Sequence, residues 1–110
     1  MKESEFVVVL TTFPMDADVT TFASTVIQER LTACVTTHPK VQSVYLWQGE
    51  IVQEKEQQLV LKTTKDRLEA LWKRVRQLHP YEVPEFLVLP IIDGNPAYFN
   101  WIRQSTTISS

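Results

Sequence analysis

The amino-acid sequence predicts an α+β fold, in which a four-stranded antiparallel sheet carries two helices on one face and a third helix follows at the C-terminus. Three observations support this prediction. Stretches rich in β-branched residues alternate with stretches whose apolar residues recur at helical spacing, in the order βαββαβ. Two successive strands are unusually long and are separated by a single glycine. No stretch of the 110 residues has the composition of a linker, which predicts one domain over residues 1–110.

The first strand and the first helix are predicted within residues 6–31. Residues 6–12, FVVVLTT, are apolar on both faces, which is typical of a central strand covered on both sides. After Pro14 the apolar residues follow helical spacing, and Asp16 or Asp18 is available as the N-cap. The apolar face predicted for this helix consists of Val19, Phe22, Ala23, Val26, Ile27 and Leu31.

A long hairpin is predicted from residues 32–48 and 50–64, with Gly49 at the reversal. Both arms exceed the usual strand length of about 5 to 6 residues, so the hairpin should project past the domain. Its far end is apolar on both faces. One interpretation is that this end folds back on the chain's own core. The other is that it pairs with neighbouring copies in a closed ring, because an exposed apolar ribbon is marginal in water. The residues concerned are Val44, Tyr45, Leu46, Trp47, Ile51 and Val52.

The second half of the chain repeats the alternation. A helix is predicted from Asp66, with Leu68, Leu71, Trp72 and Val75 on its apolar face, and the prolines of HPYEVP end it. A strand follows at residues 85–90. Asn95 as N-cap and Pro96 at the first position predict a terminal helix, whose apolar side is Tyr98, Trp101 and Ile102. Right-handed crossovers then give a ferredoxin-like arrangement with one sheet face left uncovered.

Composition excludes several classes of function. The formal charge of −2, without runs of either sign, predicts no binding to nucleic acid or to anionic membranes. Residues 6–13 are too short to span a bilayer and follow acidic residues, so neither a membrane helix nor a signal peptide is expected. Cys34 is the only cysteine, which excludes an internal disulfide and favours a reducing compartment, the cytoplasm. The loop TTFPMDAD lacks the glycine and arginine of a phosphate-binding loop, and no enzyme is predicted.

The segments LTACV, VQSVYLWQGEI, LVLKTT, HPYEVPEFLVLPI and GNPAYFNWI, in this order, resemble the CutA family of divalent-cation tolerance proteins. The resemblance covers about residues 6–102. It implies a small cytoplasmic homotrimer of ferredoxin-like subunits, similar in architecture to PII signalling proteins, with a link to copper and other divalent metal ions. The trimer agrees with the argument from the apolar hairpin, which does not depend on the resemblance.

The resemblance also implies two metal ligands. Cys34 and His79 match residues associated with copper in the family, and the exposed loop expected around His79 would make it the freer ligand. Thiolate and imidazole together favour a copper-like ion or zinc. Taken alone, however, Cys34 is typical of a small buried hydrophobic residue. Thr11 and Leu78 stand where copper-associated members can carry a further cysteine and histidine, so only weak binding is expected, with further ligands from Glu82, Glu85 or a neighbouring subunit.

A second hypothesis is a PII-like binding module that takes a small molecule or a protein in the cleft between subunits. Such clefts need aromatic walls and a few polar groups. The residues that would line it are Tyr45, Trp47, Lys62, Tyr81 and Glu82. Each also has a purely structural interpretation, because aromatic residues at the end of a hairpin often serve only in packing.

Overall fold

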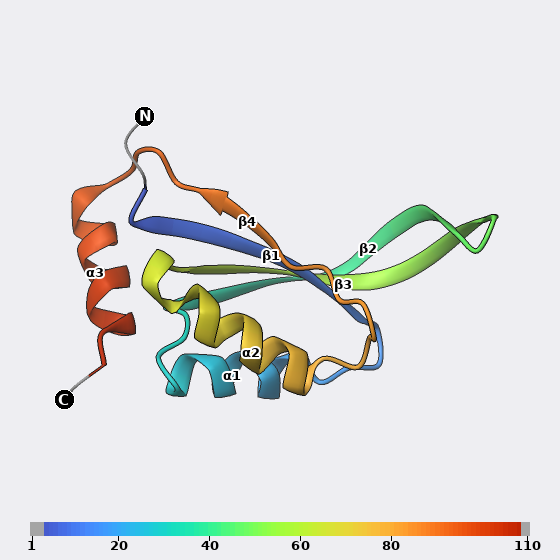
Figure 1. The fold of residues 1–110 in the computed structure, drawn as a ribbon, viewed down its shortest axis with the longest axis horizontal. Helices are drawn as coiled ribbons and strands as arrows, with labels where there is room; N and C mark the ends of the chain where they lie inside the picture. The colour runs from blue at the N-terminus through green and yellow to red at the C-terminus, as the bar shows by residue number, and fades with distance from the viewer. Residues whose placement is uncertain (1–3, 109–110) are drawn as a thin grey trace.

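The structure is a computed structural model that describes residues 4–108. It confirms the α+β fold, with a single antiparallel sheet in the strand order β2-β3-β1-β4. Helices α1 and α2 cover one face of this sheet, while α3 lies at the end opposite the projecting hairpin (Figure 1). The elements are β1 Phe6–Pro14, α1 Val19–Gln28, β2 Cys34–Trp47, β3 Glu50–Thr64, the 3₁₀ turn η1 Lys65–Arg67, α2 Leu68–Leu78, β4 Leu87–Pro90 and α3 Pro96–Thr106.

The main core lies between the sheet and helices α1 and α2. Alternate residues of β1 point toward the helices, among them Val9 and Phe13, and the residues between them point to the opposite face. Asp18 is the N-cap of α1 and accepts a hydrogen bond from the backbone N–H of Thr21. Ile27 was expected in the core but is 40% exposed, so the apolar stripe of α1 is narrower than its sequence suggests. The buried residues of this core are Val9, Phe13, Val19, Phe22, Val26, Leu31, Leu59, Leu61, Leu71 and Val75.

The hairpin of β2 and β3 extends well beyond the helices (Figure 1). Its ladder runs out to Trp47 and Glu50, with one irregularity between His38 and Val41 beside Pro39. Gln48 and Gly49 both have positive φ, 49° and 83°, the conformation that tight hairpin turns favour. The prediction that the chain reverses at Gly49 is therefore confirmed, and so is the projection of the apolar end.

The segment between α2 and β4 departs from the predicted bounds. The 3₁₀ turn precedes α2, and β4 begins at Leu87 instead of residue 85. His79 is extended, with φ −80° and ψ 134°, because Pro80 disfavours the helical region for the residue before it. Residues 79–86 thus cross from the end of α2 to the outer strand without joining the ladder. No helix within residues 4–108 is long and apolar enough to cross a membrane.

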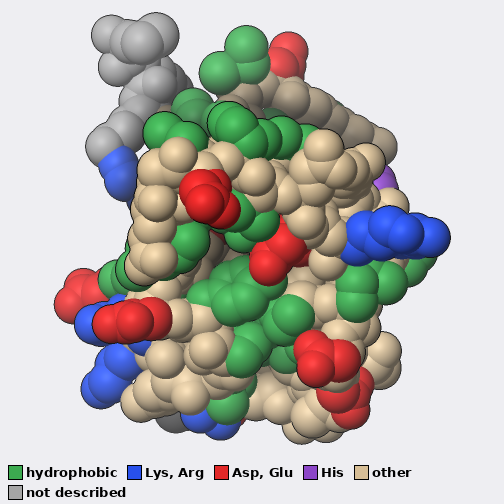
Figure 2. Space-filling model, turned by 90° about the vertical axis from the view of Figure 1, so that its right-hand side faces the viewer, with side chains coloured by type: hydrophobic (Ala, Val, Ile, Leu, Met, Phe, Trp, Pro, Cys, Tyr) green, Lys and Arg blue, Asp and Glu red, His purple; other side chains and the backbone are tan. Residues whose placement is uncertain are grey.

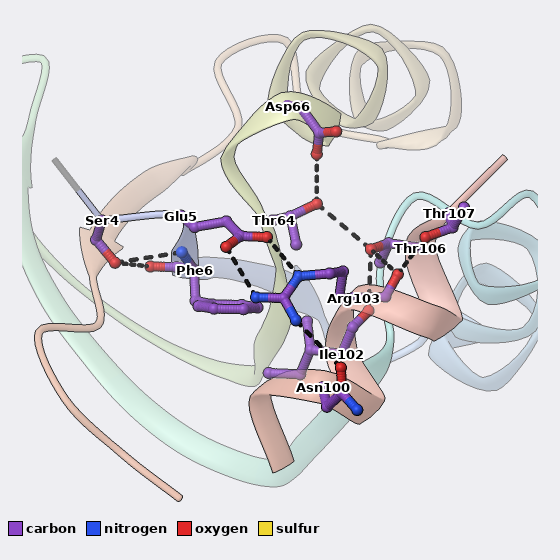
Figure 3. Close-up of polar contacts among 10 residues, drawn as sticks. All are labelled: Ser4, Glu5, Phe6, Thr64, Asp66, Asn100, Ile102, Arg103, Thr106 and Thr107. Carbon is purple, nitrogen blue, oxygen red and sulfur yellow. Dashed lines mark hydrogen bonds and ion pairs between the residues drawn. The ribbon is translucent and has the colours of Figure 1, made fainter. Parts of the chain in front are cut away.

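Helix α3 closes the end of the sheet away from the hairpin (Figure 3). Asn95 is its N-cap, as predicted, and accepts a hydrogen bond from the N–H of Ala97. Phe99 stacks on Phe6 with ring centroids 4.4 Å apart, and Ile102 is fully buried beside them. The apolar side predicted for this helix is only partly buried. Tyr98 and Trp101 are 39% and 43% exposed.

Candidate functional site at the base of the hairpin

His79 lies where the end of α2 meets the end of β1, and the expectation that it is exposed is wrong. Its side chain is 8% exposed and stacks on Phe13 with ring centroids 4.1 Å apart. Nδ1 accepts a hydrogen bond from the N–H of Tyr81 at 3.0 Å, so Nε2 carries the proton and donates to the carbonyl oxygen of Thr12 at 2.7 Å. Burial lowers the pKa of His79 below 6.5. Both nitrogens are therefore occupied in holding the loop against β1.

Two tyrosines of the predicted cleft each donate a hydrogen bond to a glutamate of β3, Tyr81 at the base of the projecting hairpin and Tyr45 farther out along it, opposite Val52. The hydroxyl of Tyr81 donates to Glu56 at 2.8 Å, and that of Tyr45 donates to Glu54 at 2.9 Å. Glu56 is 5% exposed. Burial, the hydrogen bond to Glu56 and the nearby charges of Glu56 and Glu54 raise the pKa of Tyr81, so this hydroxyl is a donor at neutral pH.

Glu85 belongs to the same cluster. Burial raises the pKa of this carboxyl, and the charge of Glu56 raises it further. Its Oε2 atom is inaccessible to water and has no hydrogen-bond partner among residues 4–108. We call the set Tyr45, Glu54, Glu56, Tyr81 and Glu85 the hairpin-base cluster.

Hydrophobic side chains surround this region. Figure 2 shows the face of the molecule toward the hairpin, where hydrophobic side chains gather in a shallow hollow with acidic side chains at its edge. Val83 of the loop is 76% exposed, and Leu87 at the start of β4 is 53% exposed. The exposed apolar residues of the hairpin are Val44, Tyr45, Leu46, Trp47 and Ile51.

Other predicted residues lie elsewhere. Trp47 is at the tip of the hairpin, and Glu82 is exposed on the loop. Cys34 is half-buried on β2 and pairs with Lys62 of β3, whose ammonium lies 5.7 Å from the centre of the Tyr98 ring. This pair therefore belongs to the α3 end of the sheet and not to the hairpin-base cluster.

A single subunit does not join Cys34 and His79 into one metal site. Cys34 and Lys62 are level with Val8, whereas His79 contacts Thr12 and Phe13, about 13 Å farther along β1 at the usual rise per residue. Directly paired residues share a face, so Cys34 points away from the helices, while Phe13 beneath His79 points toward them. Within residues 4–108 no group of three or more His, Cys, Asp or Glu side chains could hold a metal ion. The donor set of one subunit does not fit a chelated copper-like ion.

Glu54 and Glu56 were not identified from the sequence. The signal that could have revealed them is their spacing, because residues two apart on a strand share a face. On a hairpin whose arms are in register, that face also carries Tyr45, which lies opposite Val52 beside Glu54. From the sequence alone, Glu54 and Glu56 resemble ordinary solvent-exposed charged residues, because the sequence does not give the register of the hairpin.

The sequence and the structure are similar to those of known divalent-cation tolerance proteins. The family described as CutA1 divalent ion tolerance protein matches residues 7–105. Divalent-cation tolerance protein CutA of Thermus thermophilus is 46% identical over 99 residues, covering 90% of this chain and 96% of that protein. The protein of the same name from Yersinia pestis is 43% identical over 102 residues, which cover 93% of this chain and 86% of that protein.

Solved structures agree with this likeness. The divalent cation tolerance protein of Thermus thermophilus superimposes with a TM-score of 0.88 at 44% identity, covering 93% of this chain and 99% of that one. CutA from Synechococcus elongatus superimposes with a TM-score of 0.90 at 36% identity, and the match covers 97% of this chain and 95% of that one. CutA1 from Oryza sativa superimposes with a TM-score of 0.90 at 37% identity, and the match covers 97% of this chain and 98% of that one.

Proposed function

The chain belongs to the CutA1 family of divalent ion tolerance proteins, and from this premise we propose that it acts in divalent metal tolerance as a cytoplasmic homotrimer with PII-like architecture. The observation that carries the proposal is the apolar hairpin, which one subunit leaves exposed. Metal ions, copper among them, are bound weakly by the assembly. No catalytic step is proposed.

Assembly is supported by two surfaces that one copy leaves without a partner. At the distal end of the hairpin, the side chains of Leu46 and Ile51 are 67% and 71% exposed. Within residues 4–108 the outer strand β4 pairs only with β1, and its Leu87 and Leu89 are about half exposed. Exposed apolar ribbons and free strand edges invite pairing, and a closed ring covers both in every copy. Sedimentation velocity across nanomolar to micromolar concentrations tests this. A monomer at all concentrations would contradict it.

The proposed metal contacts remain Cys34 and His79, with donors brought together from different subunits. Within one subunit these residues lie on opposite sides of the sheet, so a shared ion would need copies to meet around it. His79 would also have to give up its hydrogen bond to the N–H of Tyr81 or the one to Thr12. Because metal binding would break one of these hydrogen bonds, we propose that the ion is bound weakly.

Calorimetric titration with Cu(II) tests the contacts one at a time. We expect weak binding to the wild type, a clear loss with Cys34→Ser and a smaller loss with His79→Asn. His38→Asn is measured as well, because His38 is an exposed histidine and a further candidate ligand. An isotherm unchanged by both Cys34→Ser and His79→Asn would contradict these ligands.

The second candidate is a binding module for a small molecule or protein in the cleft between subunits. The aromatic and acidic hairpin-base cluster favours it, together with Trp47, Glu82 and Lys62, whose places in the fold would let neighbouring copies bring them together. Native mass spectrometry of the protein purified from its source would test it. A retained organic ligand, lost with Tyr81→Ala, would favour this function over direct metal binding.

A further inference from the structure

The loop between β4 and α3 holds a carboxyl against the backbone nitrogen of the next residue. The N–H of Gly94 donates a hydrogen bond to Oδ1 of Asp93 at 2.8 Å. The carboxyl carbon Cγ is bonded to Oδ1, so it also lies next to this nitrogen. Two reacting groups that are held in contact react far faster than the same groups in free solution. The loop therefore brings a nucleophile, the backbone nitrogen, up to an electrophile, the carboxyl carbon.

The surroundings of this pair leave both groups free to react. Within residues 4–108 the carboxyl of Asp93 has no hydrogen bond other than the one from Gly94. Gly94 has no side chain to shield its nitrogen. Both residues are exposed, so water reaches the loop.

The other three aspartates of the chain lack this arrangement. Asp93 is the only aspartate that precedes a glycine. The carboxyl of Asp18 accepts hydrogen bonds from the N–H and the hydroxyl of Thr21, and Oδ1 of Asp66 accepts one from a threonine hydroxyl. The N–H that follows Asp16 donates to a backbone carbonyl oxygen. These three aspartates are therefore internal controls for the pair in the loop.

We propose that Asp93 and Gly94 form a site of spontaneous backbone modification, at which Asp93 converts to isoaspartate. In the first step the nitrogen of Gly94 attacks Cγ of the protonated carboxyl. The new N–C bond closes a five-membered succinimide, and the carboxyl hydroxyl leaves with the amide proton as water. In the second step water adds to a ring carbonyl. Opening at Cγ restores aspartate, whereas opening at the backbone carbonyl carbon leaves the main chain running through the side-chain methylene.

The packing of the loop links this modification to the stability of α3. A Cβ on Gly94 would stand 2.7 Å from the ring of Phe99, so the backbone passes close to that ring. Phe99 stacks on Phe6, and Asn95 is the N-cap of α3. Isoaspartate adds one methylene to the main chain just before these contacts, which displaces the cap and the stacked ring. Conversion therefore lowers the free energy of unfolding, and it needs neither a metal ion nor a second copy.

The experiment ages the full-length protein for several weeks near neutral pH, both folded and unfolded in guanidinium chloride. Peptide mapping by mass spectrometry with electron-transfer fragmentation measures isoaspartate at each aspartate. Asp93→Glu keeps the charge but would require a larger ring, so it blocks the reaction. Asp16→Glu makes the same change at another exposed aspartate and is the matched control. Urea unfolding compares fresh and aged samples of each variant.

We expect isoaspartate to accumulate at Asp93 at least about tenfold faster than at any other aspartate of the folded protein. It should also form there no more slowly than in the unfolded chain, because the fold holds the two atoms in contact. Ageing should lower the urea midpoint of the wild type and of Asp16→Glu but not that of Asp93→Glu.

Two results would overturn the proposed site: no enrichment of isoaspartate at Asp93, or faster conversion in the unfolded chain than in the folded one. Isoaspartate at Asp93 without a change in the urea midpoint would overturn the link to α3. None of these results bears on the proposed assembly or on metal binding.

Discussion

The two ends of the sheet satisfy their buried groups in different ways. At the α3 end, Thr64 and Thr106 are 4% and 3% exposed, and both have partners within the chain (Figure 3). Arg103 of α3 donates twice to Glu5 beside β1, at 2.9 and 3.0 Å. At the hairpin end, Tyr81 and Glu56 satisfy each other, but Glu85 keeps an unpartnered buried oxygen.

The difference concerns the polar groups of the two ends. The α3 end combines a small apolar cluster with buried threonines that have partners within the chain, although Tyr98 and Trp101 of α3 stay 39% and 43% exposed. The hairpin end combines exposed apolar residues with an incomplete polar cluster. Association would stabilise such a surface because it covers apolar area.

The largest effect is expected from a charge at the hairpin tip. Leu46→Glu should raise the dissociation constant of the assembly by about 100-fold or more, because it would place a carboxylate in an apolar contact. Sedimentation velocity measures it. Ile108→Glu is the matched control, since Ile108 is 62% exposed and Leu46 67%, but Ile108 lies at the α3 end. If Leu46→Glu and Ile108→Glu raised the dissociation constant equally, the hairpin end would not be the specific site of association.

The next effect concerns the α3 end. Gly94→Ala should lower the free energy of unfolding by about 1 to 3 kcal/mol, because the added Cβ would stand 2.7 Å from the ring of Phe99. The stacking of Phe99 on Phe6 limits how far this ring can move. Gly49→Asn is the comparison, because Gly49 has open space and a positive φ that asparagine tolerates. Urea unfolding at one protein concentration should show the smaller loss for Gly49→Asn.

A pH dependence is expected from His79 at the hairpin end. Because burial holds its pKa below 6.5, the unfolded chain binds a proton at pH values where the folded chain does not. The stabilisation is therefore complete above pH 6.5 and is lost as the pH falls from there toward the lowered folded value. Thermal unfolding between pH 5 and 8 measures it. His79→Asn should flatten this part of the profile.

The smallest effect is expected from the ion pair of Glu5 and Arg103. About half of each side chain is exposed, and solvent and salt screen such pairs. Glu5→Gln should change the unfolding midpoint only slightly, and the difference should vanish in 1 M NaCl, roughly where the screening length falls to about 3 Å. A loss as large as that of Gly94→Ala would show that the α3 end depends on charge more than on packing.

Local signals in the sequence determined most of the fold. The capping residue Asn95, the reversal at Gly49 and the end of α2 before Pro80 were predicted where they occur, and Asp18 is one of the two N-caps that were considered for α1. These features depend on a few neighbouring residues, whose backbone preferences and hydrogen bonds act within one turn. The order of strands and helices followed from the same local patterns and from the handedness of crossovers.

Only the tertiary structure decided how the candidate residues are grouped. The family resemblance pairs Cys34 with His79, but the strand register sets them on opposite sides of the sheet. Glu56 and Tyr81, which are far apart along the chain, are joined by a hydrogen bond at the base of the hairpin. The physical reason is that facing and burial depend on which strands pair and in what register, and contacts between distant segments set both. A local pattern therefore identifies an element, while the fold determines which side chains act together.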